Sequence, residues 1–102
     1  MFTAGILDGP LAFDNAISKQ AAIAKGIRSD VAGDPDILVV PDLEAGNILA
    51  KQLSFLAKAD SPGMVLGARV PVILTSRADS LRSRIDSSAV ATLVAHARRM
   101  GR

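Results

Sequence analysis

The sequence contains no cysteine, no tryptophan and no tyrosine, and it has a single histidine, His96. Without cysteine there is no disulfide framework, no thiolate nucleophile and no cysteine-based metal site. One histidine cannot form a paired-histidine metal site, and no spacing around His96 suggests a Ser-His-Asp triad. We therefore expect no metal ion, and we interpret His96 as a surface residue of a C-terminal helix.

Aromatic residues and net charge are also scarce, because three phenylalanines are the only aromatics and the formal charge is +2. Proteins that stack nucleic-acid bases use aromatic side chains, so we expect no nucleic-acid partner. No apolar run approaches the roughly 20 residues that cross a bilayer, and the N-terminus lacks a basic segment followed by a long apolar one. The default expectation is a cytoplasmic protein with no membrane partner.

What the sequence does contain is globular composition, with 49% hydrophobic and 22% charged residues in a length of 102, enough for one small domain at most. Its charge is uneven, since residues 69–102 hold seven arginines but only two acids, Asp79 and Asp86. A solvated basic helix explains such a tail simply, and a polyanionic ligand such as a phosphorylated cofactor is the alternative.

Short apolar runs alternate with helical periodicity along the chain. This pattern predicts strands at residues 2–7, 37–40, 64–68 and 70–75, and helices at residues 11–26, 48–59 and 83–99. The last two strands lie too close for a helical crossover, so they form either a hairpin or one extended segment that bends. Continuous apolar strands between helices predict an α/β fold with a mostly parallel sheet covered on both faces.

Three of the predicted strands end in a small polar cluster that precedes a helix. The clusters are Asp8-Gly9-Pro10, residues 42–47 and residues 76–80. In a parallel sheet these exits gather at the carboxyl edge, where open α/β folds bind ligands. Helix N-termini at the same edge favour anions such as phosphate. We therefore count Asp8 and Gly9 among the candidate substrate-binding residues.

The third cluster offers the strongest candidates for catalysis. Arg77 could clamp phosphate oxygens with its planar fork of donors, and Ser76 could donate a hydrogen bond to a developing negative charge. Asp79 could act as a base or orient Arg77. The alternative for Asp79 and Ser80 is simple capping of the last helix, and the spacing alone does not decide between the two.

The second cluster supplies three more candidate substrate-binding residues, Asp42, Gly46 and Asn47. Asp42 could equally cap the next helix, and Asn47 could sit in its first turn without a ligand. Gly46 would allow a ligand close to the backbone, although within a helix it costs roughly 1 kcal/mol relative to alanine. Asp14 and Asn15 could face the cleft or the solvent. No GxxxxGK[ST] or GxGxxG motif supports a nucleotide hydrolase or a dinucleotide enzyme.

Three ordered motifs resemble a known family. "DGPLAFDNAIS" (8–18), "DILVVPDLEAGNILAKQL" (36–53) and "GARVPVILTSRADS" (67–80) look like the C-terminal part of the phosphate acetyl/butyryl transferase family. The resemblance is strongest to butyryltransferase-like sequences, including those fused to an enoyl-CoA-hydratase-like domain. It extends over nearly the whole chain and makes residues 1–102 the C-terminal portion of a phosphate acyltransferase domain.

The resemblance implies a reaction and an architecture. Members convert acyl-CoA and inorganic phosphate to acyl phosphate and CoA, reversibly, with CoA and phosphate as substrates and no redox cofactor. The implied fold is a three-layer α/β/α arrangement related to isocitrate and isopropylmalate dehydrogenases, with the site in a cleft between two domains. Family enzymes are typically dimeric and much longer, so this chain would be incomplete at its N-terminal side and would need a second copy or the missing upstream region.

The resemblance also assigns residues. The family's Ser-Arg pair falls on Ser76 and Arg77, where arginine handles the charge of phosphate or CoA and serine polarises the acyl group. The family's aspartate base has no counterpart at the matching place, since Asp79 comes early and Asp86 late. Three functions remain open from the sequence: a phosphate acyltransferase, a module that binds CoA or phosphate without turnover, or a fragment that docks on the rest of an enzyme.

Overall fold

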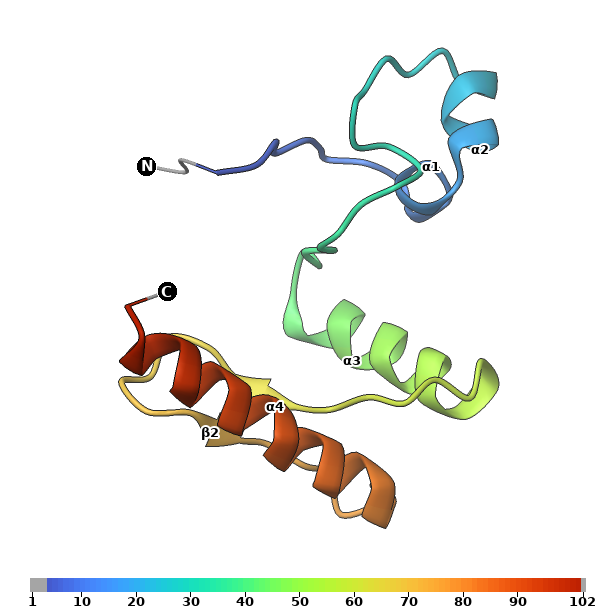
Figure 1. The fold of residues 1–102 in the computed structure, drawn as a ribbon. Helices are drawn as coiled ribbons and strands as arrows, with labels where there is room; N and C mark the ends of the chain where they lie inside the picture. The colour runs from blue at the N-terminus through green and yellow to red at the C-terminus, as the bar shows by residue number, and fades with distance from the viewer. Residues whose placement is uncertain (1–3, 102) are drawn as a thin grey trace. The chain divides into compact units, whose positions relative to one another are not determined.

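The computed structural model describes residues 4–101 and divides into two compact units, residues 1–41 and residues 42–102. The first unit contains helices α1 (Phe13–Ile17) and α2 (Lys19–Ala24). The second contains α3 (Leu43–Lys51), the π-helical turn η1 (Gln52–Leu56), strands β1 (Met64–Val65) and β2 (Val72–Ile73), and α4 (Leu81–Arg99) (Figure 1).

Two short helices replace the single helix predicted over residues 11–26. Ser18 interrupts the pattern, because its backbone is extended and its hydroxyl accepts a hydrogen bond from the Ala21 N–H at 3.3 Å. A serine side chain that bonds to nearby backbone competes with helix continuation and favours a new N-cap. The predicted end of the helix is confirmed, because Gly26 has a φ of +69° directly after the C-cap.

The loop after α2 is tied to the first unit by a close backbone contact. The N–H of Gly33 donates to the carbonyl of Ala16 at 2.9 Å, and a Cβ added at Gly33 would overlap the backbone of Lys19. Gly33 also has a φ of +92°, which side-chain-bearing residues rarely adopt. The residue at this position therefore has to be glycine for the loop to lie against the break between α1 and α2.

Two predicted strands are absent from the described part of the chain. Residues 4–7 and 37–40 form no strand, and residues 2–3 of the first prediction lie outside the described residues. An apolar run becomes a strand only where a neighbouring strand supplies its backbone hydrogen bonds, and the described residues offer these two segments none. The one ladder that they contain is antiparallel, so the mostly parallel sheet does not form within residues 4–101.

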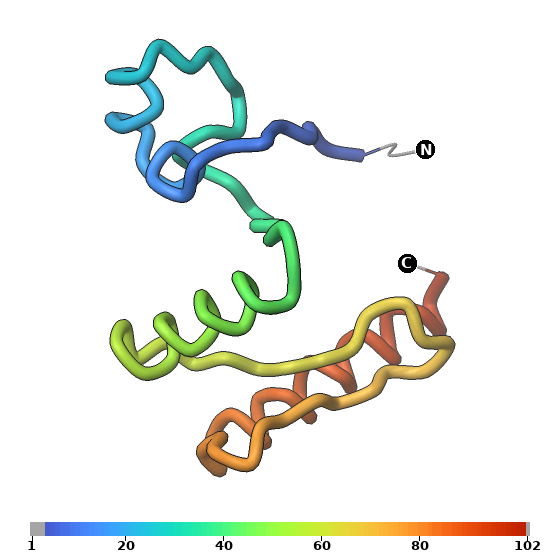
Figure 2. Tube along the Cα trace, turned by 180° about the vertical axis from the view of Figure 1, so that it is seen from behind, coloured from blue at the N-terminus to red at the C-terminus, as the bar shows by residue number. Residues whose placement is uncertain are grey.

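The hairpin interpretation of the last two strands is confirmed. Strands β1 and β2 pair antiparallel, with Met64 opposite Ile73 and Val65 opposite Val72. The Leu74 N–H extends the ladder by donating to the carbonyl of Gly63 at 3.1 Å. Both views show these two strands side by side, with α4 running along them (Figures 1 and 2).

One buried serine fastens α4 to the hairpin. Ser87 is 1% exposed, and its Oγ donates to the carbonyl of Ser83 at 2.6 Å while accepting from the N–H of Gly63 at 3.0 Å. At the other end of the helix, Nη1 of Arg98 donates to the carbonyl of Ala68 at 2.8 Å. These bonds fix α4 beside β1. The Ser76 cluster begins three residues after the end of β2.

Hydrophobic burial in the described residues is small. The apolar residues that are fully buried there are three alanines, Ala22, Ala32 and Ala91. Larger apolar side chains lie at the surface in both units, among them Ile6, Val39, Leu43, Leu56, Ile85 and Leu93. Exposed apolar side chains in such number are suited to contact with further polypeptide.

Candidate functional site

Residues 76–79 form a tight turn directly after the hairpin. The backbone N–H of Ser76 donates to Oδ2 of Asp79 at 2.6 Å, and the N–H of Asp79 donates back to the carbonyl of Ser76 at 3.1 Å. The N–H of Ala78 donates to the hydroxyl oxygen of Ser76 at 3.3 Å. The structure therefore places Ser76 and Asp79 in contact on either side of Arg77, and the catalytic roles of these three residues stay predictions.

Arg77 presents its charge to solvent from the middle of this turn. Its side chain is exposed, and no carboxylate of residues 4–101 lies within ion-pair distance of its guanidinium. Nη2 of Arg84 donates a long hydrogen bond of 3.5 Å to the backbone carbonyl of Arg77, so this contact does not involve the Arg77 side chain. A guanidinium without a carboxylate partner keeps all of its donors for an anionic ligand.

The cap of α4 is Ser80 and not Asp79. The hydroxyl of Ser80 accepts from the N–H of Ser83 at 3.1 Å, which is the bond expected of an N-cap residue. The capping interpretation is thus confirmed for Ser80 and wrong for Asp79, whose carboxylate bonds to the amide of Ser76 instead. The positive end of a helix of 19 residues lies next to the turn, where it favours an anion.

A hollow in the surface of the second unit borders this turn. It is lined on one side by Ala78, Asp79, Ser80 and Ser83, and on the other by Ser54, Phe55, Lys58, Ala59, Asp60 and Ser61. The residues of this second wall were not predicted from the sequence. Its cation, Lys58, has a left-handed φ of 57°, which a non-glycine residue adopts at a cost of order 1 kcal/mol. No sequence pattern identifies a lysine in that conformation.

The second set of candidates lies on α3. Asp42 caps this helix, because its Oδ1 accepts from the N–H of Ala45 at 2.8 Å, and α3 consequently begins before the predicted residue 48. Gly46 falls inside the helix and Asn47 is exposed on it. The capping interpretation of Asp42 is confirmed, and binding by Asp42, Gly46 and Asn47 stays a prediction.

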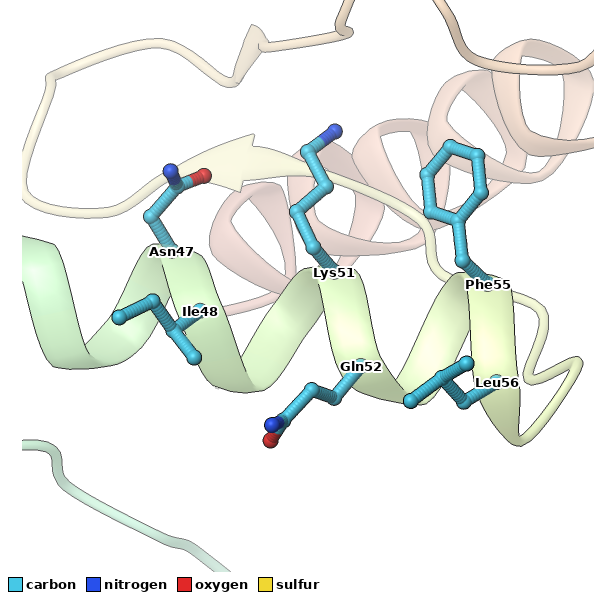
Figure 3. A pocket seen from close by; sticks show the side chains of 6 residues that line it. All are labelled: Asn47, Ile48, Lys51, Gln52, Phe55 and Leu56. Atoms are coloured by element: carbon cyan, nitrogen blue, oxygen red, sulfur yellow. The ribbon is translucent and has the colours of Figure 1, made fainter.

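Asn47 shares one side of the helical segment with a cation and an aromatic ring. Figure 3 shows Asn47, Lys51 and Phe55 projecting from one side, and Ile48, Gln52 and Leu56 from the other. Nζ of Lys51 lies 5.7 Å from the centroid of the Phe55 ring, within the range of a cation–π contact. These six side chains line an open hollow along the helix, and Phe55 also borders the hollow at the Ser76 turn.

Asp8 and Gly9 lie in the first unit. The Asp8 carboxylate accepts from the hydroxyl of Ser29 and from the N–H of Gly9, the latter at 2.7 Å. These two hydrogen bonds, with that from Ser29 the stronger cause, lower the pKa of the Asp8 carboxyl below its ordinary value. Asp8 is therefore an exposed anion held by Ser29 and by the adjacent Gly9 amide, and Gly9, with a φ of +131°, gives its loop the bend.

Asp14 and Asn15, which the sequence placed either in the cleft or in solvent, differ in their exposure. Asp14 is at the surface and forms an ion pair with Lys25 at 2.7 Å, and this hydrogen-bonded partner lowers the pKa of the Asp14 carboxyl. Asn15 is 5% exposed, so the solvent interpretation is wrong for it. Its Oδ1 atom accepts no hydrogen bond from any described residue, which leaves a buried acceptor available to a further donor.

Residues 4–101 contain neither a metal cluster nor a membrane-spanning helix. No group of three or more histidine, aspartate or glutamate side chains there is arranged to hold a metal ion. No helix in that part of the chain combines the length and the apolar character that a membrane span requires.

The chain is similar to known proteins both in sequence and in structure. Residues 3–92 match the model of the family described as phosphate acetyl/butaryl transferase. The chain belongs to this family. Among curated relatives, a phosphate acetyltransferase of Rhizobium meliloti is 67% identical over 97 residues, which are 95% of this chain and 31% of that protein. A phosphate butyryltransferase of Clostridium beijerinckii is 49% identical over 88% of this chain and 30% of its own length.

A solved structure gives the same result at the level of the fold. The crystal structure of a branched-chain phosphotransacylase from Enterococcus faecalis matches 82% of this chain with a TM-score of 0.73 and 43% sequence identity. That match covers 32% of the Enterococcus chain. The likeness supports an α/β fold, and the chain spans less than a third of the length of the relatives described here.

Proposed function

We propose that this chain contributes the Ser76–Arg77 part of a phosphate acyltransferase site. The reaction is the reversible transfer of an acyl group between CoA and inorganic phosphate. In the direction that forms the CoA thioester, the thiol sulfur of CoA attacks the carbonyl carbon of the acyl phosphate. The bond between that carbon and the phosphate oxygen breaks, inorganic phosphate leaves, and a base takes up the thiol proton. The observation that carries the proposal is the exposed, unpaired guanidinium of Arg77 beside Ser76 in a chain of this family.

The proposed roles follow from the chemistry of the two side chains. Arg77 binds the phosphate oxygens, because a planar guanidinium can meet two of them at once. Ser76 accepts from the N–H of Ala78, so its own hydroxyl proton remains to be donated to the carbonyl oxygen that becomes negative in the transition state. The transfer changes no oxidation state, so the proposed reaction uses CoA and phosphate as substrates and no redox cofactor.

The remaining candidates belong to the proposed binding of substrate. We propose that Asp42, Gly46 and Asn47, in or next to α3, and Asp8 and Gly9, in the loop before α1, take part in binding substrate. We assign no general base. The Asp79 carboxylate is engaged by the Ser76 amide, and Asp86 is paired with Arg82 at 3.2 Å.

The proposed enzyme is larger than this chain. We propose that residues 1–102 correspond to the C-terminal portion of a phosphate acyltransferase domain of three-layer α/β/α form with a mostly parallel sheet, working in the cytoplasm. A second copy or polypeptide equivalent to the rest of its relatives would complete the site. Relatives about three times as long and the extensive exposed apolar surface support this view.

A non-catalytic role is the second candidate. The small amount of buried apolar surface favours a module that holds CoA or phosphate, or that docks on an enzyme, without turning substrate over. Measurements of ligand binding and of turnover separate this candidate from the first, because a binding module binds CoA or phosphate but shows no turnover.

The test is thioester formation from CoA and acetyl phosphate or butyryl phosphate, in two proteins. One is the chain itself. The other is the Rhizobium meliloti phosphate acetyltransferase with its matching segment replaced by this chain, an exchange that 67% identity makes conservative. Turnover in the transplanted enzyme that falls sharply in Ser76→Ala and Arg77→Ala supports the catalytic proposal. CoA binding with no turnover in either protein supports the binding module.

A further inference from the structure

Asp79 makes the hydrogen bonds that define the backbone of the Ser76 turn. Its Oδ2 accepts from the N–H of Ser76 at 2.6 Å, and its own N–H donates to the carbonyl of Ser76 at 3.1 Å. Both backbone polar groups of Ser76 are thus held by one residue, and both partners are partly shielded from water. A carboxylate that accepts from a backbone amide forms a charge-assisted bond, roughly twice as strong as a neutral one.

We propose that Asp79 is a positioning residue for the Ser76–Arg77 pair, acting through the backbone of the turn and not on the substrate. The inference rests on the proposed function, because the pair matters only if an anionic substrate binds there. By fixing Ser76 at both its N–H and its carbonyl, Asp79 sets the direction in which the hydroxyl of Ser76 points. The next residue, Arg77, then projects to solvent.

A role for Asp79 as general base fits these contacts poorly. A base must take up a proton, and a protonated carboxyl loses the charge that strengthens its bond to the Ser76 amide. Each catalytic cycle would then weaken the turn that presents Ser76 and Arg77. The positioning role keeps the carboxylate ionised throughout and uses the 2.6 Å bond that the structure contains.

A role for Asp79 in capping α4 is excluded by the adjacent residue. Ser80 accepts from the N–H of Ser83 at 3.1 Å and is the N-cap. Ser80→Ala is therefore a matched control, since it removes a neighbouring polar group and destabilises the helix while leaving the bonds of the Ser76 turn intact. Loss of helix stability and loss of turn geometry can in this way be told apart.

The test compares Asp79→Asn, Asp79→Ala and Ser80→Ala by two measurements. The first is hydrogen exchange of the Ser76 amide in the chain itself, followed by nuclear magnetic resonance. The second is thioester formation by the transplanted Rhizobium enzyme that carries each variant. Asparagine retains an acceptor oxygen at the same place but cannot act as a base, so it separates positioning from proton transfer.

We expect the asparagine variant to lie between the parent and the alanine variant in both measurements. Its Ser76 amide should exchange within about fivefold of the parent rate, because a neutral acceptor retains part of the bond. In Asp79→Ala the amide should exchange about thirtyfold faster, and kcat/KM should fall about a hundredfold through misplacement of the reacting groups. Ser80→Ala should leave the Ser76 exchange rate unchanged.

Two results would overturn the positioning role. One is a loss of turnover in Asp79→Asn as large as that in Asp79→Ala with the Ser76 amide still protected, because this indicates a base. The other is an Asp79→Ala chain in which the Ser76 amide exchanges at the parent rate. Turnover that survives both Ser76→Ala and Arg77→Ala would instead refute the proposed function, whatever the exchange data show for Asp79.

Discussion

Removal of the Ser87 hydroxyl should weaken the attachment of α4 to the hairpin. Ser87 is 1% exposed, and its Oγ is the acceptor for the N–H of Gly63 at 3.0 Å. In Ser87→Ala this partly buried N–H loses its partner, which costs about 1 kcal/mol of unfolding free energy. The carbonyl of Ser83 loses only a second bond, because it already accepts from the helix backbone at this spacing.

Ser88→Ala is the matched control for this prediction. The Ser88 hydroxyl donates to the carbonyl of Arg84 at 3.0 Å in the same way, but the residue is exposed and holds no group outside α4. Both substitutions gain the same helix propensity, about 0.5 kcal/mol, so their difference isolates the bond to Gly63. Urea unfolding followed by circular dichroism measures both. Equal effects of the two substitutions would refute the role assigned to Ser87.

Three further predictions follow from single contacts. Gly33→Ala should destabilise the first unit by more than about 1 kcal/mol in thermal unfolding, because its Cβ would overlap the Lys19 backbone and its φ is +92°; an unchanged midpoint would contradict this. Asp42→Ala should lower the stability of α3 by about 1 kcal/mol through loss of its N-cap, measured as reduced helicity by circular dichroism. Unchanged helicity would contradict the capping role of Asp42. Because hydrogen bonding lowers the Asp8 pKa, its stabilising contribution is present above the ordinary value of 3.8 and is lost as pH falls through the lower folded value. In Ser29→Ala the carboxyl should titrate closer to 3.8, as followed by nuclear magnetic resonance, and an unmoved titration would contradict the cause assigned.

Local chemistry was readable from the sequence where one or two residues decide it. The end of a helix at residue 26, capping by Ser80 and a hairpin of the last two strands were predictions or named alternatives from the sequence, and the structure contains each of them. Each depends on neighbours within a few residues, such as a cap or a short connection. The grouping of Ser76, Arg77 and Asp79 was predictable for the same reason.

Features that need distant partners were not predictable in this way. Residues 37–40 have the composition of a strand, yet no described residue provides the ladder that a strand requires. One local feature was also missed, because Ser18 splits a continuous helical pattern through a side-chain bond to the nearby Ala21 N–H. The wall of the hollow that includes Lys58 depends on a π-helical turn and a left-handed residue, for which the sequence carries no signal.

The most direct measurement of the central claim is thioester formation by the transplanted Rhizobium enzyme with Arg77→Ala beside Arg99→Ala. Arg99 is also an exposed arginine and lies at the far end of α4, so it controls for loss of positive charge. We expect Arg77→Ala to lower kcat/KM by about 10²–10³-fold, since it removes the proposed anion clamp, and Arg99→Ala to leave it within about twofold. Equal activity of the two variants would contradict a phosphate acyltransferase site at the Ser76 turn.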